Sequence, residues 1–478
     1  MQCKILLENV APVVSNKNVS LQSRCLKNLF LTGLYALIGL LHPPLSLAKA
    51  TTGRPQATAT ARILQQQSQV RQVRPENYNL KRYPVIDSQK SHWRNLLWTT
   101  AVVEPQEPYV AQALNGILGL TTRSKLSKSQ MQTIDMAMQV GTQLYLSNPI
   151  LYASVEKQLI QTIKHSRNSQ WVAMALSALA KRKIAPNNLK QLSAQIRQRF
   201  PKWWQDVFLR TTLKEVAESI TPARVPPLGD LLLWTIAPRQ LHLYVICQPD
   251  RRVLCQAVLR NRNGQFVRQN GQLWSVPLLL QSIHGIGWNF NRGEAPQGIY
   301  RIEGVVPQPN DKFFRAYGQF SLVKLFLPFE SGVRKFLPKG KGRFTGSLTS
   351  YLALLPPSWR RYFPIEQSYW AGKIGRSLIR IHGSGESPNF FSKNGRYSDS
   401  YNWNPTIGCL SALELYDESG KLQQADMDKL LYALTTVGGK NFAGYMVVVE
   451  IPGASKTPIS VAEIEAKIHR SIIRKSAS

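Results

Sequence analysis

The spacing of apolar residues changes near residue 235, and this change constrains the fold more than any other feature of the sequence. Between about 91 and 235, apolar residues recur three and four positions apart, which is the spacing of one buried helix face. Beyond it, short β-branched and aromatic runs alternate with glycine and proline turns, which is typical of strands. We therefore predict an α+β chain: an N-terminal all-α region, as a bundle (favoured) or as stacked helical pairs, followed by a mainly β domain.

Individual elements follow from the same patterns. The helical spacing is clearest over 131–145, 150–164, 170–183 and 188–200. The strand candidates are 241–247, 253–259, 299–306, 320–326, 377–382 and 446–451. In the C-terminal half we also predict a helix over about 426–435 and another that begins near Ser460, where Glu463 completes the spacing of a capping box.

The N-terminus has the order of a secretory signal peptide. A basic leader precedes the uncharged, mostly apolar run 29–41, and Pro43 follows that run. Ala48 and Ala50 then supply the small residues of a cleavage site. The run is short for a membrane span, which needs about 20 residues. We predict that residues 1–50 are a signal peptide and that the protein is exported to the periplasm or cell envelope; an uncleaved anchor and a buried helix are the alternatives.

The rest of the chain divides by composition. Residues 51–90 are rich in Thr, Gln, Arg and Ala and poor in large apolar side chains, so we predict a disordered linker there. The further boundaries place an α-helical domain over 91–235, a mainly β domain over 239–455 and a C-terminal helix or tail over 456–478.

The charge is strongly positive, with 60 Lys and Arg against 27 acidic residues and a formal net charge of +33. The basic residues are spread along the whole chain, and the sequence has no Cys/His finger spacing and no aromatic RNA-binding signature. An anionic envelope polymer or membrane surface fits this charge as well as nucleic acid does. The secretory signal decides between them, so we predict no nucleic-acid partner. The sequence has no cluster with metal-ligand spacing, so no metal is predicted.

Cysteine parity singles out one residue. Two of the five cysteines lie in the predicted leader. Cys247 and Cys255 flank a turn between two predicted strands, so they form either a disulfide across a hairpin or a pair of strand thiols. Cys409 is the odd cysteine, and in an exported protein an odd cysteine suggests a reactive thiol.

The segment from His382 to Leu410 carries the candidate chemistry. A predicted strand ends at His382-Gly383, and a polar loop leads from it to Gly408-Cys409. A thiolate is the nucleophilic form of cysteine, and a nearby imidazole can take the thiol proton. Gly408 leaves room for a substrate backbone, and the N–H groups of Gly408, Cys409 and Leu410 are candidate donors to an oxyanion.

This segment resembles the signature of the L,D-transpeptidase (YkuD-like) catalytic domain, over roughly residues 239–452. In that family a strand ending in His-Gly is followed by a loop and then by Ser/Thr-His-Gly-Cys and a hydrophobic residue. The matching residues are His382, Gly383, Thr406, Gly408, Cys409 and Leu410. Upstream, Pro296 and Gly298 are similar to the family's Thr-Pro-x-Gly-x-Tyr/Phe strand, with Ala295 in place of the usual Thr.

The sequence departs from the family pattern at the general base. Ile407 occupies the position of the histidine that usually activates the cysteine, and Ser411 replaces an Arg or Asn. Our preferred hypothesis is that His382 polarises or deprotonates Cys409, with His284 as the alternative base. A third possibility is that the fold binds its ligand without turnover.

The resemblance implies a cysteine acyltransferase that acts on peptidoglycan stem peptides without a cofactor. The cysteine forms a thioester and releases a terminal D-residue, and an amine then takes the acyl group. Transfer to water gives an L,D-carboxypeptidase, and a decayed fold gives a non-catalytic peptidoglycan-binding protein. The resemblance does not extend to residues 51–235; independently of it, we expect the helical domain to serve as a scaffold or as a docking module for envelope proteins. The candidate substrate contacts are Arg380, Gly383, Tyr401, Trp403, Thr406 and Ser411. For several of these residues, simple packing or surface exposure is the alternative.

Overall fold

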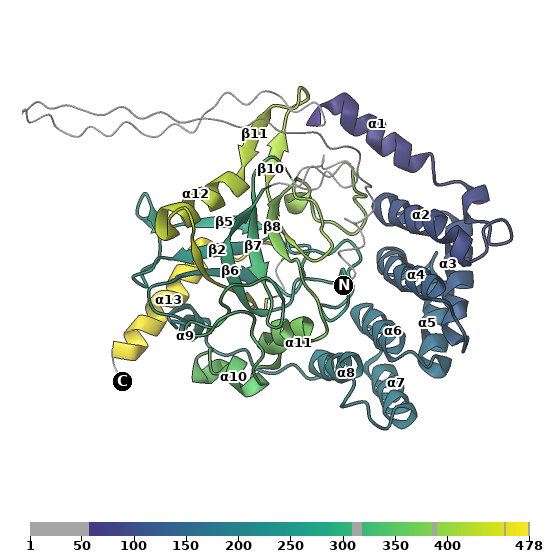
Figure 1. The fold of residues 1–478 in the computed structure, drawn as a ribbon, viewed down its shortest axis with the longest axis horizontal. Coiled ribbons are helices and arrows are strands. Elements are labelled where there is room, and N and C mark those ends of the chain that lie inside the picture. Colours follow the sequence, from purple (N-terminus) through teal and green to yellow (C-terminus); the bar gives the residue numbers. More distant parts are fainter. Residues whose placement is uncertain (1–56, 308–317, 385–389, 454–455, 477–478) are drawn as a thin grey trace, which may run out of the picture. The chain divides into compact units, whose positions relative to one another are not determined.

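The N-terminal part of the protein is helical, as the periodicity predicts (Figure 1). The structure, a computed structural model, describes residues 57–307, 318–384, 390–453 and 456–476. The helices of this region are α1 (Ala59–Val70), α2 (Lys90–Val103), α3 (Pro108–Gly119), α4 (Lys128–Ser147), α5 (Ala153–His165), α6 (Ser169–Lys181), α7 (Pro186–Arg199) and α8 (Val207–Ile220). Several begin at a capping side chain, such as Ser127 in a capping box with Gln130 on α4. The four segments predicted as helices correspond to α4–α7.

These helices form two rows. α4 packs against α2 and α6, and α6 packs against α8, whereas α5 packs against α3 and α7. Helix α6 lies at the centre, where Ala173, Ala175 and Ala178 are almost fully buried and let neighbouring helices approach closely. This arrangement of alternate helices is that of stacked helical pairs. The favoured prediction, a simple bundle, is therefore wrong, and the alternative prediction of stacked helical pairs describes the region.

The structure differs from the predicted disordered linker over residues 57–90. This stretch contains α1, which packs against α2, and a 3-10 turn, Pro75–Tyr78. Tyr78 is 4% exposed, and its hydroxyl lies 2.7 Å from the Thr100 hydroxyl. A few anchoring side chains therefore order a segment whose average composition is polar. Residues 51–56, like the predicted signal peptide, lie outside the described residues. No helix of the described part is long and apolar enough to span a bilayer.

The C-terminal part is built on a mixed sheet with the strand order β5-β2-β1-β12-β6-β7-β8-β9 (Figure 1). β1 and β12 are parallel, as are β8 and β9, and the other neighbouring pairs are antiparallel. The strands are β1 (Leu241–Cys247), β2 (Cys255–Arg260), β5 (Ser275–Leu278), β6 (Gly298–Val306), β7 (Leu322–Phe326), β8 (Arg380–Gly383), β9 (Leu410–Ala412) and β12 (Ala443–Glu450). Two small hairpins pair β3 (Arg268–Gln269) with β4 (Gln272–Leu273) and β10 (Glu414–Tyr416) with β11 (Leu422–Ala425). Each predicted strand overlaps one of the strands observed.

The two outer strands of this sheet are tied to each other. Leu279, directly after β5, exchanges two backbone hydrogen bonds of 2.9 Å with Ser411 in β9. A second bridge joins Ser282 to Thr406. The turn that carries Cys409 is therefore fastened to the same segment at both of its ends, and the order of the sheet places it beside β8.

The remaining helices pack with the sheet domain. They are α9 (Leu228–Leu232), α10 (Leu348–Leu352), α11 (Gln367–Lys373), α12 (Asp426–Gly438) and α13 (Val461–Ser476). α12 confirms the helix predicted over 426–435. α13 begins as predicted, with the Ser460 hydroxyl accepting from the Glu463 N–H at 3.1 Å. α9 and α13 meet at Gly229, where a Cβ would lie 1.9 Å from the Ser471 hydroxyl. Both helices therefore belong to the core of the sheet domain, across the predicted boundaries at 235 and 455.

A long connection between β5 and β6 joins the sheet domain to the helices. Its apolar side chains Ile283, Ile286 and Phe290 lie in the core of the helical region. The buried Asn289 amide also donates to the hydroxyls of Thr211 at 2.9 Å and Thr212 at 2.8 Å, both in α8. The two regions consequently form one compact unit.

Candidate active site

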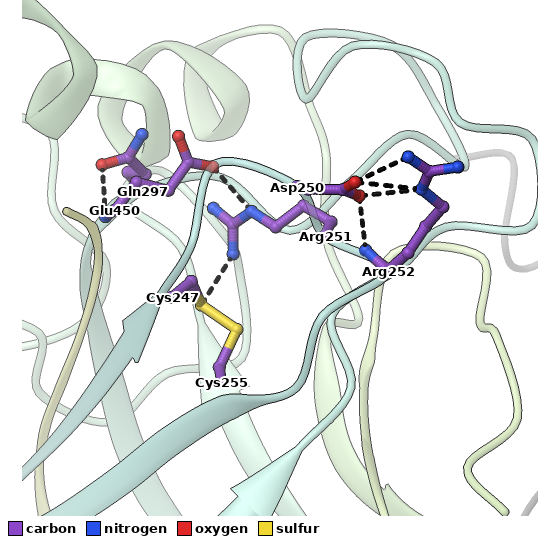
Figure 2. Close-up of a disulfide and its surroundings, with 7 residues drawn as sticks. All are labelled: Cys247, Asp250, Arg251, Arg252, Cys255, Gln297 and Glu450. Atoms are coloured by element: carbon purple, nitrogen blue, oxygen red, sulfur yellow. Dashed lines mark hydrogen bonds and ion pairs between the residues drawn. A yellow bond between two sulfur atoms is a disulfide. The ribbon is translucent and has the colours of Figure 1, made fainter. Parts of the chain in front are cut away.

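The Cys247–Cys255 pair forms a disulfide with a Cα–Cα distance of 4.3 Å, which settles the alternative left open by the sequence. Figure 2 shows Arg251, from the turn between the two cysteines, lying between the disulfide and Glu450. Its Nη1 is 3.1 Å from the Cys247 sulfur, and its Nε donates to a Glu450 oxygen at 2.6 Å. Cys409 is the cysteine outside the disulfide in the described part of the chain.

The turn before β9 is held by a threonine. The Thr406 hydroxyl donates to the Cys409 carbonyl at 2.7 Å and accepts from the Gly408 N–H at 3.1 Å. Gly408 has a φ of 114°, which favours glycine. The Gly408 N–H, a predicted oxyanion donor, would have to exchange this internal bond to serve in that role. The Leu410 N–H is directed towards β8, because Ser411 pairs with Leu279 on the opposite side and backbone groups alternate.

The Cys409 side chain is 8% exposed, and its sulfur lies 3.7 Å from the carbonyl oxygen of Leu378, two residues before β8. Two further groups are close enough to interact with it electrostatically: the Tyr300 hydroxyl from β6 and the Arg376 guanidinium. Burial raises the pKa of Tyr300 well above its usual range, so this phenol stays neutral. Burial lowers the pKa of Arg376 to about 10, which leaves it positively charged at neutral pH.

His382 is brought beside the Cys409 turn by strand pairing. β8 and β9 are parallel, with His382 opposite Ser411, two residues after Cys409. The ring is 3% exposed, and its Nδ1 is 3.0 Å from the Gly383 carbonyl oxygen. A carbonyl only accepts, so Nδ1 carries a hydrogen and Nε2 is the proton acceptor of the neutral ring. A neutral imidazole with this tautomer is suited to act as a base.

His284, the alternative base, lies in a different environment. It is fully buried, and its Nδ1 is 3.0 Å from the Gln143 side-chain oxygen of α4. Burial, aided by the charge of Arg292, lowers the pKa of His284 to about 3. This ring is neutral at physiological pH and a poor proton acceptor. Its contacts lead to the helical region, and they make it a link between the two regions.

The predicted substrate contacts divide into two groups. One group lies at the Cys409 turn or on a strand beside it and consists of Thr406, Ser411 and Gly383. All three of these residues have structural contacts. Ser411 is fully buried with its hydroxyl 2.8 Å from that of Ser384. A Cβ on Gly383 would lie 1.6 Å from a Glu414 oxygen, so this glycine makes room for a buried carboxylate.

The other predicted contacts are Arg380, Tyr401 and Trp403. Arg380 Nη1 donates to the carbonyls of Leu325 and Ile379 at 2.8 and 2.7 Å. Trp403 is 8% exposed and belongs to a small apolar cluster in the sheet domain, which supports the packing alternative. Tyr401 is partly buried, with the cations of Lys393 and Arg396 over its ring.

Sequence reasoning missed a group of charged residues between the two regions. Lys181 of α6 forms an ion pair of 2.9 Å with Glu294. Burial raises the pKa of Glu215 in α8 to about 7, against the opposing charge of Lys181. Burial also raises the pKa of Glu450, which pairs with Arg251. Arg376 interacts with Glu294 as well as with Cys409, so these charges continue up to the thiol. The residues are scattered between 181 and 450, and no local spacing could have indicated their meeting.

A second missed feature is a small, partly open cavity beside Pro405, on the helical side of the turn. Its polar lining includes Glu104, Gln143, Gln281 and Arg396. Gln143 donates to Glu104 at 2.7 Å and also contacts His284. Burial raises the pKa of Glu104 to about 7. Within the described residues, the Nε and Nη1 atoms of Arg396 have no hydrogen-bond partner.

Three comparisons with known proteins add no neighbour. Neither the protein-family models nor the curated proteins nor the solved structures contain a match to this chain. The function must therefore be argued from the residues and their geometry.

Proposed function

We propose that this protein is an exported peptidoglycan L,D-transpeptidase that uses Cys409 as its nucleophile. One observation carries the proposal: three segments that are far apart in the sequence lie close to this cysteine. They are strand β8 with His382, the turn 406–409, and strand β6 with Tyr300. The same three segments carry the resemblance to the family signature.

The reaction would consist of two acyl transfers. His382 takes the thiol proton at Nε2, and the Cys409 thiolate attacks the carbonyl carbon of an L,D-peptide bond. The C–N bond breaks, the terminal D-residue leaves with the proton, and a thioester remains on Cys409. The amine of a second stem peptide then attacks the thioester carbonyl. A C–N bond forms, the C–S bond breaks, and the amine proton passes to His382.

Two features support the cell envelope as the place of action. The Cys247–Cys255 disulfide has both cysteines fully buried, and such structural disulfides belong to oxidising compartments. The formal charge of +33 favours binding to anionic envelope polymers. Sacculus binding should accordingly weaken as the salt concentration rises, and pull-down over a salt series measures this.

A specific observation favours a second candidate, a peptidoglycan-binding protein without turnover. Ile407 replaces the usual catalytic histidine, and its side chain packs against the core of the helical region. A ring at that position would have to leave this core to reach the thiol. The binding-only function therefore competes directly with transpeptidation.

Products from a tetrapeptide muropeptide separate these functions. The full chain is incubated with the muropeptide and the products are identified by mass spectrometry. A crosslinked dimer supports transpeptidation, a tripeptide supports the L,D-carboxypeptidase alternative, and sacculus binding without product supports the binding-only function. Cys409→Ala should abolish both products while leaving sacculus binding intact. Equal product from Cys409→Ala and wild type would rule out the cysteine mechanism.

A further inference from the structure

Arg376 occupies a place that the sequence did not single out. It follows α11 and precedes β8, and its side chain is only 8% exposed. Its Nη1 donates to the carbonyls of Trp288 and Glu294, and its Nη2 donates to the carbonyl of Gly293 at 2.9 Å. These carbonyls fix the guanidinium in one position.

The charge of Arg376 is not cancelled by its partners. The three acceptors are neutral backbone oxygens. Among residues 57–307, 318–384, 390–453 and 456–476, no carboxylate forms an ion pair with this side chain. A buried cation held by carbonyls keeps a strong field, because little water screens it. That field acts on Cys409 and on Tyr300.

Gly408 is shaped to this arrangement. A Cβ at this position would lie 2.5 Å from Arg376 Nη2 and 2.7 Å from the Gly293 oxygen. The guanidinium therefore packs directly against the backbone of the residue before Cys409, at a place where any larger residue would displace it. The positive φ of 114° excludes a side chain for a second, independent reason.

We propose that Arg376 is the positioning residue that stabilises the thiolate of Cys409, and that Gly408 is a glycine so that this guanidinium can approach the thiol. The inference rests on the proposed role of Cys409 as nucleophile. In the family motif one histidine both accepts the thiol proton and stabilises the thiolate. Here His382 takes the proton, and Arg376 supplies the permanent positive charge. Among the described residues, the titratable groups that interact with this cation or with the thiol include the neutral phenol of Tyr300 and the carboxylate of Glu294.

The test is the pH profile of Cys409 alkylation by iodoacetamide in the full chain, followed by mass spectrometry of the peptide that contains Cys409. The ratio of the rates at pH 6 and pH 10 reports the thiolate fraction and cancels differences in access. We expect Arg376→Gln to lower this ratio about tenfold or more, because an adjacent cation lowers a thiol pKa. Arg376→Lys should restore much of it. Arg334→Gln, which removes the same charge from a 70% exposed side chain, should leave the ratio unchanged.

An unchanged ratio in folded Arg376→Gln would overturn the proposal. If that variant does not fold, Arg376→Met decides the matter, because it keeps an extended side chain but removes the charge. A lowered ratio in Arg376→Met supports the proposal, and a ratio equal to wild type contradicts it. Alkylation needs no peptidoglycan, so the result stands whether or not the protein forms crosslinks.

Discussion

The Cys409 turn contacts the sheet on one side and the helical region on the other, and the two sides differ in the chemistry of their side chains. On the sheet side lie strand β8 with His382, the backbone around Leu378 and the fixed cation of Arg376. On the helical side, Ile407 packs into the helical core together with Phe390 and Phe391 of the loop after β8. The sheet side thus provides groups that can move protons and stabilise charge. The helical side provides apolar contacts that hold the loop in place.

The largest effect should come from the sheet side. His382→Gln removes the proton acceptor, so we expect acyl transfer to fall about 100- to 10,000-fold with little change in the melting temperature. The rate of product formation from the tetrapeptide muropeptide, measured beside thermal unfolding, checks this.

The matched control for this prediction is His284→Gln, on the helical side. That histidine has a pKa of about 3 and contacts Gln143, so its loss should affect stability more than rate. A large loss of rate in His284→Gln, with His382→Gln close to wild type, would reverse the roles assigned to the two histidines and break the comparison.

Removing the disulfide tests how much the β1–β2 hairpin contributes to the stability of the sheet domain. Replacing Cys247 and Cys255 by serine opens a link between residues eight positions apart, which should cost about 2.5 kcal/mol of unfolding free energy by the loop-entropy relation. Denaturant unfolding measures the loss. Reduction of the wild type without substitution should produce a similar change, and no change in either case would mean that the hairpin needs no covalent link.

On the helical side, the buried carboxylate of Glu104 should make the stability of the protein depend on pH. Its folded pKa of about 7 lies above the ordinary value of 4.5, so the native state favours the protonated form. Its contribution is therefore most favourable below about pH 4.5 and is lost as the pH rises to about 7. Glu104→Gln should gain about 1–2 kcal/mol over wild type at pH 8, after allowance for solvent screening, and almost nothing at pH 4.

Thermal unfolding across this pH range measures the effect of Glu104→Gln. Glu107→Gln, which alters an exposed carboxylate three residues away, is the control and should leave the pH dependence as it is in wild type. An advantage of Glu104→Gln that is equal at pH 4 and pH 8 would show that burial does not control this group.

The smallest effect is expected at Ile407, which is only partly buried. Ile407→Ala should cost about 1 kcal/mol of stability, because part of a helical-core contact is lost. The thiolate fraction of Cys409, measured by alkylation, should stay near the wild-type value. A strong change in thiol reactivity would mean that the helical side also tunes the chemistry.

Much of the fold could be predicted from local patterns. β1 has the predicted bounds, and α12 follows the pattern of its apolar residues and stops where the glycines begin. These successes rest on the periods of helices and strands, which any short window of sequence contains. For Cys247 and Cys255 the sequence left two alternatives, a disulfide or two strand thiols, because both residues flank a single turn.

The site was only partly accessible to such reasoning. The motif indicated that His382 and Cys409 belong together, and the parallel pairing of β8 and β9 places His382 beside the strand that directly follows Cys409. The bridge from Leu279 to Ser411 and the approach of Arg376 to Gly408 join residues with no common period. Contacts of this kind depend on the whole chain, and a single sequence does not display them.

The central claim is that Cys409 forms a covalent acyl intermediate. The most direct test is the intact mass of the full chain after rapid acid quenching of its reaction with a tetrapeptide muropeptide, followed by peptide mapping. We predict an added mass equal to the muropeptide without its terminal D-residue, located on Cys409 and missing from Cys409→Ala. Crosslinked or trimmed products formed without this adduct, or an adduct on a different residue, would contradict the account.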